Sequence, residues 1–193
     1  VLVKLAESHS RLLSARALRI RPGTDDKVLA AWNGLMLATF AEAERVLFND
    51  QDSVAKKQYY EVATRNAEFL LKALSPNGQL RRAWRNGKAT SEVFLEDYAA
   101  LILGLLELYQ TDFNTKWFAS AKDLADEMIQ KFSDPSGGFF DTPNNGEALL
   151  VRPKDVQDNA TPSANTLACE ALLKLAAFTD HGEYRVIVEK SLR

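Results

Sequence analysis

The chain has 193 residues, the size of one ordinary globular domain, and its 24 Lys and Arg against 26 Asp and Glu give a net charge of -2. This balance argues against the strong positive field of a nucleic-acid-binding or anionic-membrane-binding domain. The single Cys169 cannot form an intramolecular disulfide, and no apolar run is long enough to span a membrane, so a cytoplasmic setting is expected. With only 9 Gly and 6 Pro among many Leu and Ala, the composition predicts an all-α fold.

Hydrophobic periodicity places the helices along the chain. After an amphipathic N-terminal stretch, we predict helices over about 29–48, 54–74, 94–110, 115–132 and 162–178. The second and fourth of these have one apolar face, whereas the others are more apolar, most clearly between Ala99 and Leu108. Asn114 is the expected N-cap of the fourth helix. Gly34 marks either a close approach of another backbone or a ligand, or the point where the first helix begins.

The helices form an internal repeat. The C-terminal halves of the apolar helices align, which brings Trp32, Leu95 and Pro162 into register at separations of 63 and 67 residues. Each unit is one buried inner helix followed by one amphipathic outer helix. The period is too long for tetratricopeptide, HEAT or armadillo repeats, which span about 34–47 residues. The extra length lies in loops at about 75–93 and 133–161, of which the second could form a small β-hairpin within 137–153.

Both long loops lead from an outer helix to the next inner helix, so we expect them on one rim of the fold. Carboxylates and amides recur there in every unit: Asp25, Asp26, Asn33, Glu96, Asp97, Asp155, Asp158, Asn159 and Asn165. Each one is readily explained as a helix cap, because such side chains satisfy free N–H groups and complement the helix dipole. Their recurrence in three units, with aromatic residues nearby, instead favours sugar chemistry, in which carboxylates act as acid, base or nucleophile and flat rings stack on the sugar.

We therefore name Asp97 as the best candidate for a catalytic acid or base, with Asp26 or Asp158 as its partner. The side chains expected to shape the substrate pocket are Trp32, Asn33, Trp84, Tyr98, Asn159 and Asn165. Neither His9 nor His181 falls on the rim, so neither a histidine acid/base pair nor a histidine metal site is expected. No cofactor is expected.

Three segments carry a recognisable family pattern. They are RIRPGTDDKVLAAWNGL at 19–35, FLEDYA at 94–99 and RPKDVQDNATPSAN at 152–165. In this order they resemble the C-terminal region of the thioredoxin-domain-containing family that includes the spermatogenesis-associated thioredoxin-like proteins and their bacterial relatives. The resemblance covers nearly the whole chain. It departs from the family pattern at Ala164, where the family has Gly, and at Gly23-Thr24, where bulkier residues are more usual.

The resemblance implies an α/α toroid of the six-hairpin glycosidase type, similar to the N-acylglucosamine 2-epimerase and cellobiose epimerase fold. It also implies a longer protein with an N-terminal thioredoxin-like domain, in which residues 1–193 form a partial toroid domain of about half a ring. Epimerases of this architecture use histidines as acid and base, which this rim lacks, whereas toroid glycosidases use carboxylates.

The leading hypothesis is a carbohydrate-active or carbohydrate-binding fragment of a toroid, resembling a glycoside hydrolase if it is an enzyme. The alternative is a non-catalytic helical scaffold that presents clients to the thioredoxin-like domain, and a weaker third hypothesis is a fold that retains no ligand. The expected partners are a carbohydrate, the rest of the toroid and the thioredoxin-like domain. Exposed apolar faces on the terminal hairpins also predict that the isolated chain self-associates.

Overall fold

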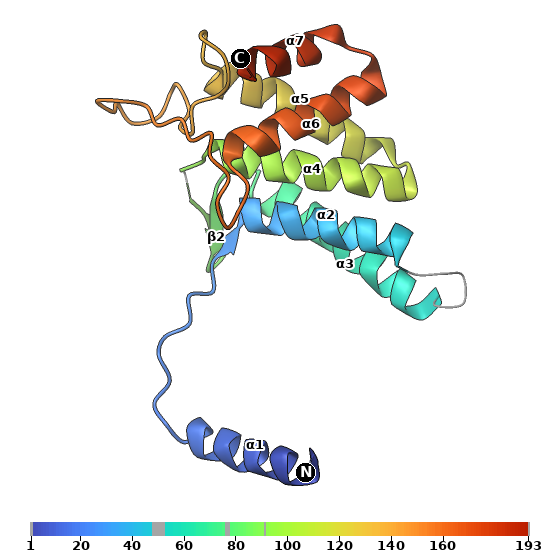
Figure 1. Ribbon diagram of the computed structural model, residues 1–193, viewed down its shortest axis with the longest axis vertical. Coiled ribbons are helices and arrows are strands. Elements are labelled where there is room, and N and C mark those ends of the chain that lie inside the picture. Colours follow the sequence, from blue (N-terminus) through green and yellow to red (C-terminus); the bar gives the residue numbers. More distant parts are fainter. Residues whose placement is uncertain (1, 48–52, 76–77, 91, 193) are drawn as a thin grey trace.

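The computed structural model describes residues 2–47, 53–75, 78–90 and 92–192 and is mainly helical (Figure 1). The described helices are α1 (Leu2–Ala17), α2 (Ala30–Val46), α3 (Ser53–Ala73), α4 (Leu95–Asp112), α5 (Thr115–Phe132), α6 (Ala164–Thr179) and α7 (Gly182–Ser191). The all-α prediction is therefore confirmed. Over the described residues, no helix has the length and apolar character that crossing a membrane requires.

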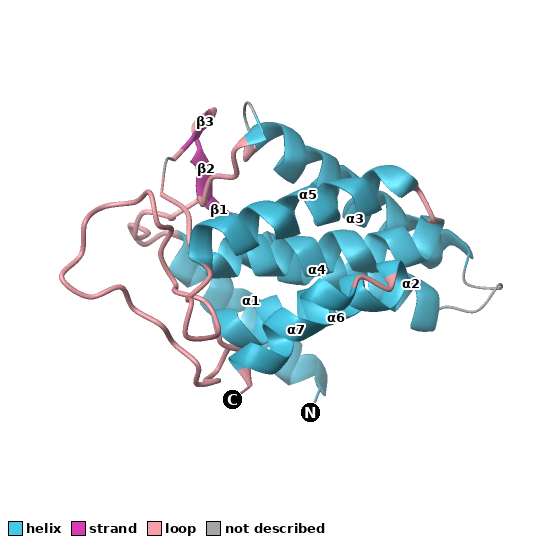
Figure 2. Ribbon diagram, turned by 90° about the horizontal axis from the view of Figure 1, so that it is seen from above, coloured by secondary structure: helices cyan, strands magenta, loops and turns pink. Residues whose placement is uncertain are grey.

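Three helical hairpins stand side by side, with the inner helices α2, α4 and α6 next to one another, the outer helices α3 and α5 behind them, and α7 beside α6 at the end of the stack (Figures 1 and 2). The centre of the stack is α4, which packs against α2, α5 and α6. All of its side chains from Asp97 to Leu108 are buried, which explains why this stretch is apolar nearly all round. The predicted repeat of inner and outer helices is confirmed.

The helix ends agree with the sequence to within a few residues. Asn114 is the N-cap of α5, where its side-chain oxygen accepts a hydrogen bond of 3.1 Å from the backbone N–H of Lys116. The amphipathic N-terminal stretch is α1, which stands away from the three hairpins at the end of the extended residues 20–27 (Figure 1).

The predicted β-hairpin within 137–153 is wrong, because only an isolated bridge between Ser133 and Phe139 forms in that region. Its Pro-Asn-Asn-Gly run at 143–146 favours turns over strand pairing. A small antiparallel sheet forms elsewhere, from β1 (Val28–Leu29), β2 (Ala83–Arg85) and β3 (Lys88–Ala89). The turn between β2 and β3 is Asn86-Gly87, and both residues have the positive φ that a tight hairpin turn of this kind requires.

The two central inner helices touch backbone to backbone. A Cβ atom added at Gly34 of α2 would lie 2.6 Å from the carbonyl carbon of Ala100 in α4. A Cβ atom added at Gly104 of α4 would likewise lie 2.6 Å from the carbonyl oxygen of Gly34. Gly34 therefore lies inside α2 and marks a close approach of another backbone, which was one of the alternatives that the sequence left open.

Replacement of Gly34 by Ala tests this contact. The added methyl group meets backbone atoms that cannot move aside without shifting a helix, so Gly34→Ala should lower the free energy of unfolding by about 2 kcal/mol, despite the higher helix propensity of Ala. Denaturant titration followed by far-UV circular dichroism measures the loss. The matched control is Gly182→Ala at the start of α7, where an added Cβ atom meets nothing within 4 Å. Equal stability of the two variants would contradict the close packing.

Candidate functional site

The loops that lead into the inner helices meet at one end of the hairpin stack, as the repeat predicts. Figure 2 shows the small sheet and the loop 133–163 at this rim, next to the first turns of α4 and α6. Asn165, at the start of α6, is buried and fixes the longest loop from inside. Its Nδ2 donates to the carbonyl oxygens of Phe139 and Asp155, both at 2.9 Å, and its Oδ1 accepts from the N–H of Phe139 at 2.8 Å.

Asp97 is fully buried in the first turn of α4 and joins two inner helices. Its Oδ2 accepts from the N–H of Phe94 at 3.0 Å, and its Oδ1 accepts from the N–H of Ala31 in α2 at 3.2 Å. Arg82 lies 3.4 Å from Oδ2. Burial raises the pKa of Asp97 to about 6, although the two N–H groups and Arg82 oppose the shift. Asp97 is thus a helix cap and a link between α2 and α4.

The other two catalytic candidates are exposed and hold different segments. Asp26 forms an ion pair with Arg85, with a distance of 2.5 Å between Oδ1 and Nε. Oδ1 of Asp158 accepts from the N–H of Ser163, the N-cap of α6, and from the hydroxyl of Thr166, both at 2.8 Å. Neither these two carboxylates nor Asp97 lines either of the two rim hollows, described below.

The candidate aromatic and amide residues are spread over different surroundings. Tyr98 is fully buried and its hydroxyl accepts from Lys131, while Trp84 packs edge-on against Phe69 with 5.4 Å between ring centroids. Asn33 donates to the carbonyl oxygen of Leu29, the N-cap residue of α2. Trp32 is 68% exposed on α2 and Asn159 lines a rim hollow, so these two remain open to a ligand.

A hollow of about 470 Å³ opens between the loops that precede α4 and α6. We call it the acidic hollow, because three of its lining residues are Glu96, Asp141 and Asp155. The N–H of Asp155 donates to Oδ2 of Asp141 at 3.0 Å, which places these two residues together. Glu96 forms an ion pair of 2.7 Å with Arg82, whose guanidinium carbon lies 4.6 Å from the ring centre of Phe94.

Asp141 has the environment of a proton donor. Its Oδ1 is buried and has no hydrogen-bond partner among the described residues. Burial raises the pKa of Asp141, and the nearby charges of Asp155 and Glu96 raise it further, against a lowering by the N–H of Asp155. A carboxyl group with a raised pKa beside a carboxylate that is ion-paired with an arginine is an environment in which one acid and one base can coexist.

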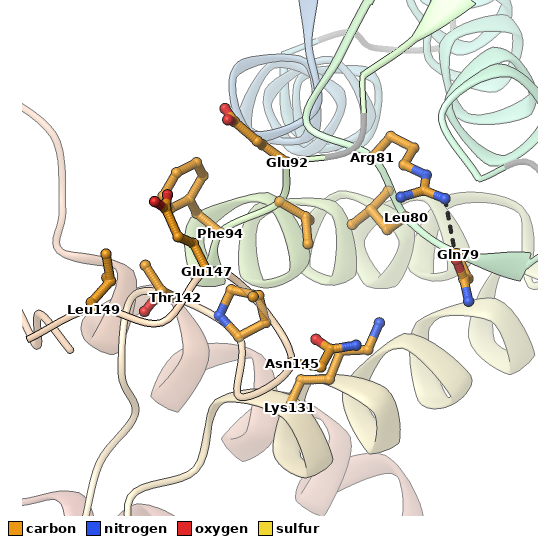
Figure 3. Close-up of a pocket in the computed structure, with 13 residues that line it drawn as sticks. Gln79, Leu80, Arg81, Glu92, Phe94, Lys131, Thr142, Asn145, Glu147 and Leu149 are labelled. Atoms are coloured by element: carbon orange, nitrogen blue, oxygen red, sulfur yellow. Dashed lines mark hydrogen bonds between the residues drawn. The ribbon is translucent and has the colours of Figure 1, made fainter.

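A second hollow, of about 520 Å³, lies on the other side of Phe94, which lines both. Gln79 and Arg81 face Phe94 and Glu147 across it, and Lys131 and Asn145 line its floor (Figure 3). Lys131 forms an ion pair of 2.5 Å with Glu127, so Glu127 balances the positive charge of Lys131. Among the described residues, no group of three His, Cys, Asp or Glu side chains is placed to hold a metal ion.

The acidic hollow contains residues that the sequence analysis named only as rim acids, Glu96 and Asp155, and two that it missed, Phe94 and Asp141. A signal for Asp141 was present, because it is an acid in a long rim loop that directly follows Phe139 and Phe140. The spacing of residues in the sequence could not show that Asp97 caps α4 while its neighbour Glu96 faces the hollow.

The pH dependence of stability tests the burial of Asp97. The unfolded chain releases the proton of Asp97 near pH 3.8 and the folded chain only near pH 6, so the folded state binds more protons between these values. The stability that Asp97 contributes should therefore fall as pH rises from about 4 to about 7, by at most about 3 kcal/mol. The measurement is the difference in unfolding free energy between wild type and Asp97→Asn across this range.

Asp158→Asn is the matched control, because hydrogen bonds from the N–H of Ser163 and the hydroxyl of Thr166 lower the pKa of Asp158. Its contribution has the opposite sign and is lost as pH falls through its folded pKa. A wild-type minus Asp97→Asn difference that stays flat or rises with pH would contradict the buried environment of Asp97.

The chain resembles known proteins in both sequence and fold. No family model matches the chain. Human spermatogenesis-associated protein 20 is 36% identical over 186 residues, which is 90% of this chain and 23% of that protein. An uncharacterized protein of Caenorhabditis elegans is 30% identical over 187 residues, or 93% of this chain and 25% of that protein. The chain thus spans about a quarter of the length of the curated relatives it matches.

Solved structures show the same fold at low sequence identity. Cellobiose 2-epimerase from Spirochaeta thermophila has a TM-score of 0.65 at 18% identity, with 86% of this chain and 42% of the epimerase covered. The GH76 alpha-mannanase of Bacteroides thetaiotaomicron has a TM-score of 0.66 at 16% identity, with 89% and 45% covered. These likenesses confirm that the three hairpins have the fold of about half an α/α toroid.

Proposed function

We propose, for a chain that is homologous to part of spermatogenesis-associated protein 20 and folds as about half an α/α toroid, that it binds a carbohydrate in the acidic hollow. The observation that carries the proposal is the meeting of Glu96, Asp141 and Asp155 with the ring of Phe94 in one hollow on the rim. The hollow's volume of about 470 Å³ falls in the range of small-molecule sites.

In this proposal Asp141 is the proton donor and Glu96 the base or charge stabiliser of a glycosidic reaction. Asp141 supports the first role because it lines the hollow and its carboxyl group has a raised pKa. Glu96 supports the second because Arg82 holds its carboxylate at 2.7 Å. Phe94 and Pro162 supply apolar wall against which a sugar ring can pack.

The other rim residues divide into ligand contacts and supports. We assign a ligand contact to Asn159, which lines the hollow, whereas Trp32 is exposed on α2 and lines neither rim hollow. Asp97 and Asn165 are positioning residues, since Asp97 bonds to the N–H of Phe94 and Asn165 bonds to the backbone of Phe139 and Asp155. Asp26 forms an ion pair with Arg85, and Asp158 accepts a hydrogen bond from Ser163 at the start of α6.

The same proposal places the chain within a larger assembly. The solved toroids are more than twice as long as the part of them that the chain matches, so further hairpins would complete the ring and enclose the rim. The partners are then the rest of the toroid and, as the family resemblance implies, a thioredoxin-like domain in the same polypeptide. No cofactor is part of this proposal.

Neutralising the acids of the hollow tests the proposed function. A glycan array, followed by titration calorimetry on any sugar class that binds, measures affinity for wild type, Glu96→Gln and Asp141→Asn. Each change removes a carboxyl oxygen that can form a hydrogen bond with a sugar hydroxyl and should weaken binding by about tenfold or more. The control is Asp123→Asn, which neutralises one exposed carboxylate on α5, away from the hollow.

Binding of no sugar class by wild type would overturn the proposal, as would equal binding by all four proteins. Where turnover is observed as well, the activity should fall as pH rises through the raised pKa of Asp141, because the proton donor is then lost.

A non-catalytic scaffold is the second candidate. The observation that favours it is that Asp97 and Asp158 both serve as structural caps rather than facing a ligand. This role predicts that client proteins are captured equally well by wild type and by Asp141→Asn, whereas the carbohydrate proposal predicts that the variant fails only with sugars.

A further inference from the structure

In the structure, the outer helices α3 and α5 each contact the hairpin that follows them, whereas every described residue of α1 is exposed. Tyr60 of α3 donates to Asp112 at the end of α4 at 3.1 Å, and Glu68 of α3 pairs with Lys116 of α5 at 3.1 Å. Likewise, α5 contacts the third hairpin, because Tyr184 of α7 donates to Asp126 of α5 at 2.9 Å. An outer helix thus lies against both helices of the next hairpin or beside its outer helix.

The corresponding position on the first hairpin is open. A groove of about 390 Å³ runs between α2 and α3. We call it the α2–α3 groove, and its apolar lining includes Met36 and Phe40 from α2 and Val62 and Phe69 from α3. Met36 is 51% exposed there, although it lies on a helix whose opposite face is buried against α4. This is an apolar surface of the kind that another element normally covers.

The helix α1 has the character of an outer helix. Its residues Leu2, Leu5, Leu12 and Leu13 fall on one face at helical spacing, which they share with His9 and Arg16, whereas Lys4 and Arg11 fall on the opposite face. All of α1 is exposed in the structure, so its apolar face is unpartnered. Like α3 and α5, it precedes a long connection that leads at the rim to the next inner helix.

We propose that α1 docks into the α2–α3 groove of its own chain and runs antiparallel to α2. The direction follows from the connection, which joins the C-terminal end of α1 to the N-terminal end of α2. The ten residues 18–27 can span up to roughly 33 Å when extended, so the connection is long enough to place α1 against the groove. In this arrangement Leu12 lies near Met36, and Leu5 lies near Phe40 and Val62.

Docking would also act on the proposed carbohydrate site. Residues 18–27 include Asp26, which holds Arg85 of the rim sheet, so fixing α1 restricts the connection where it enters the rim. The docked helix would cover part of the apolar surface of the first hairpin. The proposal itself does not rest on sugar binding, since it concerns only contacts between α1 and the first hairpin.

Disulfide trapping in the full chain tests the docking. In a Cys169→Ala background, Leu12→Cys with Met36→Cys should form an intramolecular disulfide about tenfold faster than Arg11→Cys with Met36→Cys, since tenfold corresponds to a docked population of about 90%. The two pairs have nearly the same sequence separation and differ in the face of α1 that carries the thiol. Non-reducing electrophoresis and peptide mass spectrometry identify the bond and show whether it joins one chain or two.

Equal rates for the two pairs, or no bond, would overturn the proposal, because a freely moving α1 presents both faces alike. A bond that forms only between two chains, and that slows on dilution, would also overturn it and would assign the groove to α1 of a second copy.

Methionine oxidation gives a readout that needs no added cysteine. The chain has two Met residues, of which Met128 is fully buried and serves as the internal reference. Docking should protect Met36 from peroxide, so Leu5→Asp with Leu12→Asp should raise its oxidation rate several-fold relative to wild type. Lys4→Asp with Arg11→Asp changes the charge of α1 more but spares the apolar face, and should leave the rate unchanged. The same rate in all three proteins would contradict docking.

Discussion

The close contact between α2 and α4 is the constraint on which the arrangement of the rim depends. Gly34 and Gly104 bring the two backbones together, so any side chain at either position would force the helices apart. Because α2 and α4 start at the same end, this contact also sets the distance between their N-termini. Only at this separation can Asp97 of α4 bond to the N–H of Ala31 in α2. The glycine contact and the Asp97 link therefore depend on each other.

At the opposite end of the inner helices, ion pairs join α2, α4 and α6. Glu107 of α4, whose side chain is 9% exposed, pairs with Arg45 of α2 and, at 2.5 Å, with Lys174 of α6. Burial alone would raise the pKa of Glu107, but hydrogen bonds from Lys174 and Arg45 outweigh it and lower the pKa. A buried carboxylate of this kind is costly without its partners, so it specifies which helices meet more than it adds net stability. This end of the stack is thereby fixed by ion pairs, and the rim end is fixed by the Asp97 link.

The rim shows how similar carboxylates acquire different uses. Glu96 and Asp97 are neighbours in sequence, yet Asp97 points into the helix contact and Glu96 faces the acidic hollow. Asp141 and Asp155 enter the hollow from a loop whose backbone Asn165 holds in place. Asp97 caps α4 and Asp158 bonds to the start of α6, whereas Glu96, Asp141 and Asp155 line the hollow. A ligand is therefore expected at these three acids, two of which lie in a loop and not at a helix N-terminus.

The sequence by itself determined the helices and their alternation, because these follow from local periodicity and from a repeat of inner and outer helices. The half-ring fold followed from the family resemblance of its three motifs. The sequence also indicated Asn114 as a cap, since capping depends on neighbouring residues in the chain, whereas the choice among the alternatives at Gly34 depended on Ala100 of α4. The tertiary structure decided which acids face a hollow, because burial, unpaired oxygens and pKa shifts arise only where segments distant in sequence meet. It likewise decided where the sheet forms, since Val28 pairs with Trp84 across 56 positions of the chain, beyond the reach of any local pattern.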